Sequence, residues 1–443
     1  MRWLLIADYP AVEISLDKPG WRRGVLAASI VIALLVCYEA GRIWLAEVRV
    51  HSHSVAVIER GVSLESGNGD AWDRLGRYHQ WDFTNPDITK AISDFSSAVR
   101  DDPHSAHFLM DLAGAYEAAG DVSRAQQTWN RARSVYPASA EVDWNYGNFL
   151  LRQGQFSDGY AQFRRAVRGD SSLLPLAISR TWRSSQDVNQ LMNQVLPADE
   201  NAYIQALDFF ASTHRAGQGL PIWQRLMEMH KPLTLDRSFP FLEELIREDR
   251  AQDAAQIWRQ ALTAAGLPHS EPEHSSLVWN GDFSQDFANG GLGWRWDNPL
   301  GAGIDFDSAP SGYGKRSVRI DFTGGENIYL DEPKQYVPVE PNRTYHFRAY
   351  LRTETISTES GMRFLLLDPS HPSDVHVMTD NLTGTQPWTS VEADVTTGPQ
   401  TQFLLLSLHR AQSRLFENEL SGTVWIADVS LTPIAGAPEK SAP

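Results

Sequence analysis

The sequence predicts a multidomain chain, α first and then β: one transmembrane helix, an α-solenoid of helix-turn-helix repeats, and a C-terminal β-sandwich jelly roll. Three observations predict this fold class. An uncharged run lies near the N-terminus, a 34-residue period follows it, and apolar and polar residues alternate in the last third. We expect a cytoplasmic tail at 1–23, an anchor at 24–46, repeats at 55–266, a linker at 267–274, the β-sandwich at 275–436 and a disordered tail at 437–443.

The composition narrows the classes of function. The chain has 443 residues, of which 42% are hydrophobic, enough for two or three folded domains. Its formal net charge of −16 is opposite to the basic surface that nucleic-acid binders need, so we expect no nucleic-acid partner. The one cysteine, Cys37, excludes an intramolecular disulfide, zinc fingers and iron–sulfur clusters.

The uncharged run at 24–38 predicts a membrane span. At about 1.5 Å per residue it covers about 22 Å, and extension to Trp44 brings it close to a ~30 Å hydrocarbon core. Lys18, Arg22 and Arg23 precede the run, whereas Arg42 and Arg49 follow it. The positive-inside rule therefore predicts a single-pass protein of the cell membrane, with a cytoplasmic N-terminus and a periplasmic or extracellular body. A processed signal sequence and a soluble core helix are the alternatives.

The 34-residue period places similar residues at fixed positions in three consecutive units. In the central unit they are Leu109, Leu112, Ala113, Tyr116, Gly120, Ala125, Trp129, Ala132 and Pro137. Small residues allow two helices to cross closely, and large ones fill the space around the crossing. The pattern resembles the tetratricopeptide repeat, which implies stacked helix pairs that bury their apolar faces against their neighbours. We expect three clear repeats, then degenerate helical hairpins at 201–219 and 235–266.

The resemblance implies a protein or peptide partner bound in the concave groove of the repeats. At the positions that line this groove in the family, the candidate residues are Arg77, Trp81, Glu117, Trp144, Asn148 and Arg152. Trp81 and Trp144 are large apolar residues where the fold does not require bulk. A groove that is only solvated, or filled by a helix of this chain, is the alternative.

From residue 275 onward, a two-residue alternation predicts many short strands. The apolar sets include Val318, Ile320 and Phe322, then Tyr345, Phe347, Ala349 and Leu351, and also Trp425, Ala427, Val429 and Leu431. Segments 280–284, 293–294, 317–320, 335–339, 341–345 and 422–429 resemble carbohydrate-binding modules of the family 4/9/22 type, which share the galactose-binding-like jelly roll. The resemblance implies a polysaccharide ligand.

Sugar binding requires aromatic faces that stack on the C–H faces of sugars, and planar polar groups for their hydroxyls. The glycan-binding candidates are Arg348, Tyr350, Arg352, Trp388, Arg410 and Arg414. The first three share the non-core face of one predicted strand, because side chains two residues apart point the same way. A packed or merely exposed surface residue is the alternative for each of them.

The same resemblance implies a structural calcium ion, bound near the Asn-Gly-Asp-Phe motif and a pair of aspartates close to the C-terminal end of the module. Asn280, Asp282 and Asp428 match these positions, whereas Ala427 replaces the first aspartate of the pair. Apart from calcium, we expect no cofactor.

No common catalytic motif is present: the sequence lacks HExxH, GxSxG and the phosphate-binding GxxxxGK pattern. Anchor, repeats and β module together account for the chain, so we expect no enzyme. The sequence instead predicts a membrane-anchored adaptor that joins a protein partner to a glycan in cell-envelope or exopolysaccharide assembly or export. The alternative is a purely protein–protein scaffold whose jelly roll does not bind sugar.

Overall fold

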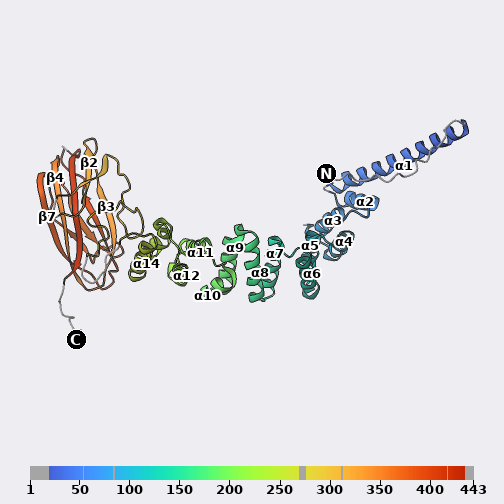
Figure 1. The fold of residues 1–443 in the computed structure, drawn as a ribbon, viewed down its shortest axis with the longest axis horizontal. Coiled ribbons are helices and arrows are strands. Elements are labelled where there is room, and N and C mark those ends of the chain that lie inside the picture. The colour runs from blue at the N-terminus through green and yellow to red at the C-terminus, as the bar shows by residue number, and fades with distance from the viewer. Residues whose placement is uncertain are drawn as a thin grey trace, which may run out of the picture. The chain divides into compact units, whose positions relative to one another are not determined.

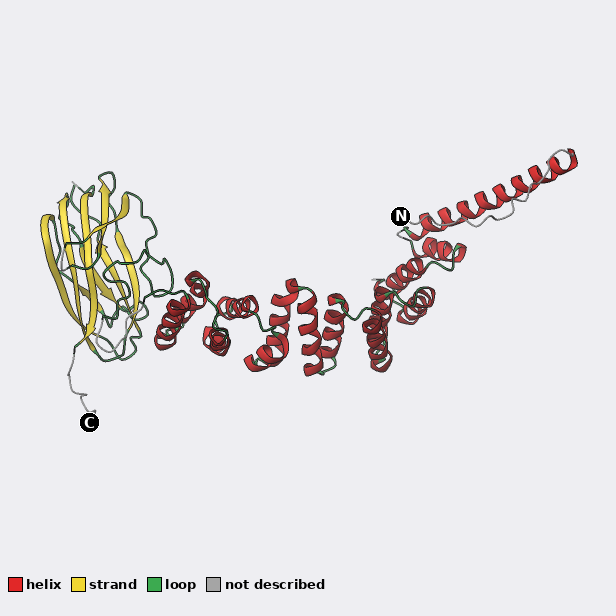
Figure 2. Ribbon diagram, viewed as in Figure 1, coloured by secondary structure: helices red, strands yellow, loops and turns green. Residues whose placement is uncertain are grey.

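The structure is a computed structural model, and it describes residues 19–52, 54–82, 85–268, 276–310, 313–416 and 418–434. The chain divides into two compact units, Met1–Ser171 and Ser172–Pro443. Among the described residues, the first unit is helical, whereas the second begins with helices and ends with strands (Figure 2). This order confirms the predicted fold class, helices first and β-structure second.

The first helix, α1 (Pro19–Val50), has 32 residues and is long and apolar enough to cross a membrane. Its length and composition are those of a membrane anchor or of a signal sequence. It extends beyond the expected end at residue 46, and Ala46 and Val50 in its last turns are buried. They contact α2 (Val55–Leu64), where Gly61 lies so close that a side chain would come within 3.0 Å of the Ala46 carbonyl oxygen. The end of α1 is therefore part of the first unit's fold.

Three helix pairs, α3 to α8, follow in the first unit (Figure 1). They are α3 (Gly69–Trp81) with α4 (Ile88–Asp101), α5 (Ala106–Ala118) with α6 (Val122–Val135), and α7 (Ala140–Arg152) with α8 (Phe156–Gly169). Side-chain oxygens of Asn68, Asp87, Ser105, Asp121 and Ser139 accept hydrogen bonds from the first turns and fix where the helices begin. In the first and third pairs a glycine allows the close crossing: a Cβ on Gly76 or Gly147 would lie 2.8 Å from the ring of Phe95 or Phe163.

The second unit begins with a less regular run of helices. These are α9 (Leu174–Ser185), α10 (Val188–Gln190), a π-helical turn η2 (Leu191–Val195), α11 (Glu200–Ser212), α12 (Ala216–Glu228), a 3-10 turn η3 (Leu235–Ser238), α13 (Phe239–Arg247) and α14 (Ala251–Ala264). The hairpin expected at 235–266 corresponds to α13–α14, whereas the one expected at 201–219 covers α11 and only the first turn of α12.

The last two helices pack directly against the β-structure. The Glu243 carboxylate of α13 accepts a hydrogen bond of 2.9 Å from the Gly291 N–H and pairs with Arg295 at 2.8 Å. Trp258 of α14 meets Trp279 edge to face, with 5.4 Å between ring centroids. For this reason the compact units divide at residues 171 and 172, and not at the linker expected at 267–274.

The strands form a two-layer antiparallel sandwich. They are β1 (Ala302–Ser308), β2 (Arg316–Thr323), β3 (Leu330–Pro338), β4 (Thr344–Ile356), β5 (Arg363–Leu367), β6 (His376–Met378), β7 (Gly384–Thr396), β8 (Phe403–Arg410) and β9 (Ser421–Pro433). One sheet has the order β1-β2-β9-β4-β7 and the other β3-β8-β5-β6. Buried residues of both sheets form the core, among them Val318, Ile320, Phe347, Leu351, Leu404, Leu406 and Ile426. The alternation predicted in β2 and β4 is present.

The alternation predicted for β9 is wrong at its first residue. Trp425 lies on the outer face, whereas its neighbours Val424 and Ile426 are buried in the core. A bulge opposite 348–350 contains Asp428, whose φ is 46°, and it shifts the register by one residue. Ala427 and Val429 are then buried as expected.

Candidate functional site

The groove candidates lie on α3, α5 and α7, the first helix of each pair. Arg77 of α3 reaches α5, where its Nε lies 2.9 Å from Asp111 Oδ2, and it also pairs with Asp73 at 2.8 Å. Arg152 of α7 makes two hydrogen bonds of 2.7 Å to the Glu117 carboxylate of α5. The pairs Arg77–Asp111 and Arg152–Glu117 therefore join successive repeats to one another, and partly exposed ion pairs of this kind contribute about 0.2–1 kcal/mol each.

Asp73 is the buried member of the first ion-pair group. Burial, with a further contribution from the Asp111 carboxylate, raises the pKa of Asp73 to about 7, although the Arg77 guanidinium acts in the opposite direction. Burial removes water from the charged carboxylate, and the attraction of Arg77 makes up only part of the free energy that this costs. The sequence pattern gave no sign of this group, because it depends on how α3 and α5 face each other.

The two groove tryptophans differ. Trp81, at the end of α3, is 71% exposed. Trp144 is half-buried on α7, with its ring centroid 4.7 Å from that of Phe163 on α8. Asn148 is also half-buried, and its Nδ2 donates a 2.9 Å hydrogen bond to the carbonyl oxygen of Trp144. Trp144 therefore has a packing role that the repeat pattern did not predict, whereas Trp81 presents its ring to solvent.

On the sandwich, the side chains of the five-stranded sheet that point away from the core form a surface that we call the outer sheet face. Arg348, Tyr350 and Arg352 of β4 lie on it, alternating with buried residues. Arg348 Nη2 lies 3.3 Å from Asp428 Oδ2, and its guanidinium carbon lies 5.5 Å from the Tyr350 ring centroid. Arg352 pairs with Glu354 at 2.9 Å. With Trp388 of β7, described next, four of the six glycan-binding candidates share this surface.

An aromatic cluster completes this part of the outer sheet face. Tyr313, in the loop before β2, lies between Tyr350 of β4 and Trp388 of β7. Its ring centroid is 4.6 Å from that of Tyr350, with the planes at 72°, and 5.7 Å from that of Trp388, with the planes at 16°. The sequence pattern named Tyr350 and Trp388 as candidates but not Tyr313, because a loop residue carries no periodic signal.

Arg410 and Arg414 lie elsewhere. Arg410, at the end of β8 in the other sheet, is fully buried, and it donates hydrogen bonds to the Ser360 carbonyl oxygen at 2.9 Å and to Thr358 Oγ1 at 3.1 Å. It also bonds to the Ile328 carbonyl oxygen, and burial lowers the pKa of its guanidinium. A side chain held in this way is not accessible to a glycan. Arg414 is exposed, but it follows β8 and is not part of the outer sheet face.

The three calcium candidates line one pocket of about 420 Å³. Calcium takes six to eight oxygen ligands. Here Asn280 uses its amide on Gln285, accepting from the backbone N–H at 2.9 Å and donating to the carbonyl oxygen at 2.8 Å. Lys315 lines the same pocket, and Asp428 pairs with Arg348. These residues do not fit a calcium ion, so calcium has no part in the function proposed below.

The Asn-Gly-Asp-Phe motif has a clear structural purpose instead. Phe283 is fully buried in the sandwich core. The chain passes so close to β9 that a Cβ on Gly281 would lie 1.9 Å from the Val429 carbonyl oxygen. Only glycine fits at this contact, and the Asn280 amide then holds the loop that follows.

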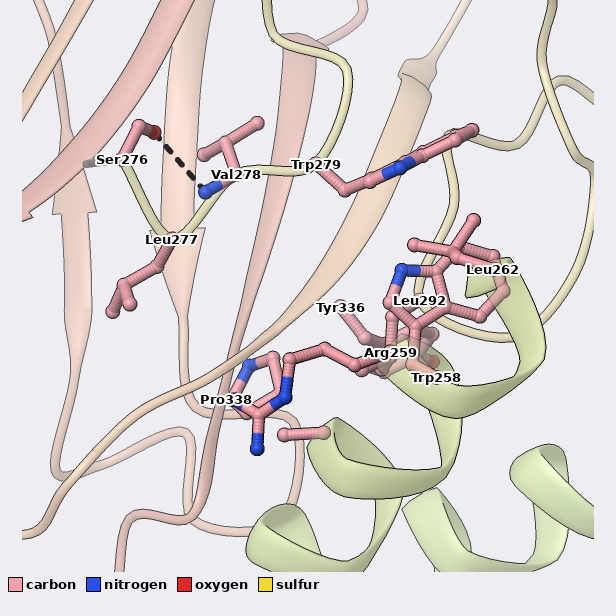
Figure 3. A pocket seen from close by; sticks show the side chains of 11 residues that line it. Trp258, Arg259, Leu262, Ser276, Leu277, Val278, Trp279, Leu292, Tyr336 and Pro338 are labelled. Atoms are coloured by element: carbon pink, nitrogen blue, oxygen red, sulfur yellow. Dashed lines mark hydrogen bonds between the residues drawn. The ribbon is translucent and has the colours of Figure 1, made fainter. Parts of the chain in front are cut away.

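A second cavity, of about 120 Å³, lies between α14 and the sandwich (Figure 3). Its lining is mainly apolar: Ala255, Trp258, Leu262, Leu277, Val278, Trp279, Leu292, Tyr336 and Pro338, with Arg259 and Ser276 as polar members. The Trp258 Nε1 atom is buried and has no hydrogen-bond acceptor among the described residues. The cavity lies where helices and strands meet, a junction that the sequence did not predict.

Comparison with known proteins supports the helical part. Two family models, both described as tetratricopeptide repeat, match residues 85–143 and 115–173. These matches extend from α4 to α8 and confirm the predicted repeats. Repeats of this kind indicate a scaffold for protein–protein interaction. Neither match reaches the sandwich, so its resemblance to carbohydrate-binding modules stays a prediction.

Neither the curated proteins nor the solved structures indicate a function for this chain. A search of the curated proteins gave no match. A solved structure titled "Functional Characterization of Pseudomonas Aeruginosa pilF" is similar over 46% of this chain and 77% of that chain, with 15% sequence identity and a TM-score of 0.24. A TM-score of this size carries no argument about function.

Proposed function

We propose that this chain is an adaptor at a membrane, which binds a protein through its repeats and a glycan through the outer sheet face. The cluster of Tyr313, Tyr350 and Trp388 carries the glycan part. These rings lie outside a core that is already filled by other residues, and aromatic faces bind the C–H faces of sugars. Arg348 beside them offers planar hydrogen-bond donors for hydroxyl groups.

The charge of the outer sheet face narrows the class of glycan. Its strands carry more acidic than basic side chains: Asp305, Asp307, Asp321, Glu354, Glu392, Asp394 and Asp428 against Arg319, His346, Arg348 and Arg352. A polyanionic chain would be repelled by this surface. We therefore expect a neutral polysaccharide or one that carries amino groups.

The protein part rests on the repeats and on Trp81. An exposed tryptophan at the end of α3 is the kind of residue that anchors a partner, because tryptophan contributes strongly to interfaces. Among the groove candidates, Arg77, Glu117 and Arg152 already pair across repeats. For this reason we expect an apolar or aromatic segment of the partner to contact Trp81.

The membrane part rests on α1. Because Ala46 and Val50 are buried against the first unit, proteolytic removal of the whole helix would uncover part of the fold. This favours an anchor over a signal sequence. With the positive charge that precedes the uncharged run of this helix, the repeats and the sandwich would lie outside the cytoplasm. By analogy of architecture, an adaptor there, with a glycan as one partner, suits assembly or export of an envelope polysaccharide.

The test is a titration of the full chain, purified in detergent, with neutral, amino-sugar and anionic oligosaccharides, followed by tryptophan fluorescence. We expect binding of the first two classes, and loss of binding in Tyr350→Ala and in Trp388→Ala. Arg414→Ala, an exposed arginine outside the outer sheet face, is the matched control and should bind as the wild type does. If the folded protein binds none of the sugars, the chain is a protein–protein scaffold and the glycan part is wrong.

A further inference from the structure

Three side chains with metal-binding atoms converge on the groove side of the first two repeats. Asp73 comes from α3, and His107 and Asp111 come from α5. His107 and Asp111 are four residues apart, so they share one face of their helix. His107 Nε2 lies 3.7 Å from Asp73 Oδ2 and 3.7 Å from Asp111 Oδ2. One imidazole and two carboxylates thus face a common point.

The separation of these ligand atoms is close to that around a metal ion with tetrahedral coordination. Two ligands that are each about 2.0–2.1 Å from a tetrahedral metal lie about 3.3–3.4 Å apart. The two distances from His107 are 3.7 Å, and all three ligand atoms lie within 4.8 Å of one another, so the side chains would have to rotate toward one another to reach this spacing. Calcium would need more oxygen ligands, and magnesium prefers oxygen to imidazole, whereas ions of the zinc class accept both donor types.

A second observation concerns Asp73 alone. Its side chain is only 7% exposed; its Oδ2 atom faces Arg77 and His107, and its Oδ1 atom is buried without a hydrogen-bond partner among the described residues. A buried carboxylate with a free oxygen is costly unless a cation or donor compensates it. The two carboxylates share one arginine, so the group lacks positive charge.

The point on which the three ligands converge is occupied by a cationic nitrogen. Arg77 Nη2 lies 2.8 Å from Asp73 Oδ2 and 2.8 Å from Asp111 Oδ2, and it also contacts His107 Nε2. The Arg77 side chain is 44% exposed, so it can turn into solvent without crossing the core. A guanidinium that touches all three atoms fills the position that a metal ion would take.

We propose that Asp73, His107 and Asp111 bind a divalent transition-metal ion of the zinc class, which displaces the Arg77 guanidinium. Three protein ligands leave a fourth position for water or for a side chain of a partner. The site lies in the groove but does not depend on glycan binding.

The experiment uses the full chain in detergent, without an affinity tag that binds metals, and stripped of metal by a chelator. Co²⁺ is titrated and the visible absorption of tetrahedral Co²⁺ is recorded, and Zn²⁺ is then added to displace it. We expect one Co²⁺ per chain. His107→Ala and Asp111→Asn should each lower the affinity by at least about tenfold, because each removes a ligand or its charge.

Arg77→Met provides the decisive variant. It removes the competing cation but keeps the length of the side chain, so the affinity should rise. His104→Ala, which removes an exposed histidine just before α5, is the control and should bind as the wild type does. Equal affinity in the wild type and in His107→Ala, or weaker binding in Arg77→Met, would overturn the proposal. Circular dichroism of each variant shows that loss of binding does not come from unfolding.

Discussion

Arg352 and Trp425 are paired across β4 and β9, and the guanidinium carbon of Arg352 lies 4.3 Å from the centroid of the indole ring. The Trp425 Nε1 donates a 2.9 Å hydrogen bond to Asp307 Oδ2. Arg352 therefore covers one face of the Trp425 ring, and the Nε1–H of that ring is already hydrogen-bonded. Of the tryptophans on the outer sheet face, Trp388 is the better candidate for sugar stacking.

Replacing Arg352 should affect stability more than glycan binding. Arg352→Ala removes a cation–π contact of about 0.5–1 kcal/mol and uncovers the Trp425 ring. We expect a decrease of that size in the free energy of unfolding, measured by urea denaturation and tryptophan fluorescence. Arg414→Ala is the control, with a change near zero. A large loss of sugar affinity at unchanged stability would instead make Arg352 a direct ligand.

The two groove tryptophans should separate stability from partner binding. Trp144→Ala should lower the free energy of unfolding by about 2 kcal/mol, because its half-buried ring packs on Phe163. Trp81→Ala should change it by less than about 0.5 kcal/mol, because its ring is exposed. Helix unfolding followed by far-ultraviolet circular dichroism measures both. Equal losses in the two variants would contradict the difference in packing.

Gly281→Ala tests the close contact between the loop and β9. The added methyl carbon would lie 1.9 Å from the Val429 carbonyl oxygen, and backbone must move to make room. We expect the sandwich to lose at least about 2 kcal/mol of stability. Gly303→Ala in β1 is the matched control, because nothing lies within 4 Å of its added carbon. If both variants melt alike, the contact is not tight in solution.

The stability of the repeats should depend on the protonation of Asp143. Burial raises the pKa of this carboxyl, although Arg165 and Arg133 act in the opposite direction. An unfolded aspartate loses its proton near pH 4, whereas the folded one keeps it to a higher pH. The folded state then binds more protons, so stability falls as the pH rises from about 4 through the raised pKa.

Melting temperatures of the wild type and of Asp143→Asn, measured at several pH values from 4 to 7, check this dependence. The variant should lose less stability across the range than the wild type. Asp158→Asn, which removes an exposed carboxylate of the neighbouring α8, is the control for the change in net charge. A steeper decline in Asp143→Asn than in the wild type would show that the sign is wrong.

The sequence predicted those features of the fold that follow from the periodic spacing of apolar residues within one helix or strand. Ala113 belongs to an apolar pattern with the spacing of a helix face, and Phe347 to one with the spacing of a strand face. Both residues are buried, as these patterns predict. The position of Trp425 was not predictable in this way, because one extra residue near Asp428 reverses the alternation. The prediction that Arg410 lies on the surface was wrong. Arginine side chains are normally exposed, and this one is buried because the surrounding carbonyl oxygens accept its hydrogen bonds.

The features that depend on contacts between distant elements were not predictable from one sequence. The group of Asp73, His107 and Asp111 exists because α3 and α5 face each other in a particular register. The packing of Trp258 on Trp279 joins a repeat-like helix to the sandwich. Neither leaves a periodic pattern, since each requires the relative position of two elements rather than the spacing within one.

The end of α1 has a mechanical consequence. The helix runs without a break to Val50, whose side chain is buried with Ile58 and Val62 of α2. If the apolar part of α1 lies in a bilayer, no flexible hinge separates the lipid from the first packed helices. A twist or tilt of α1 in the membrane would then be transmitted as torque to α2, so that lipid thickness would influence the orientation of the first repeat.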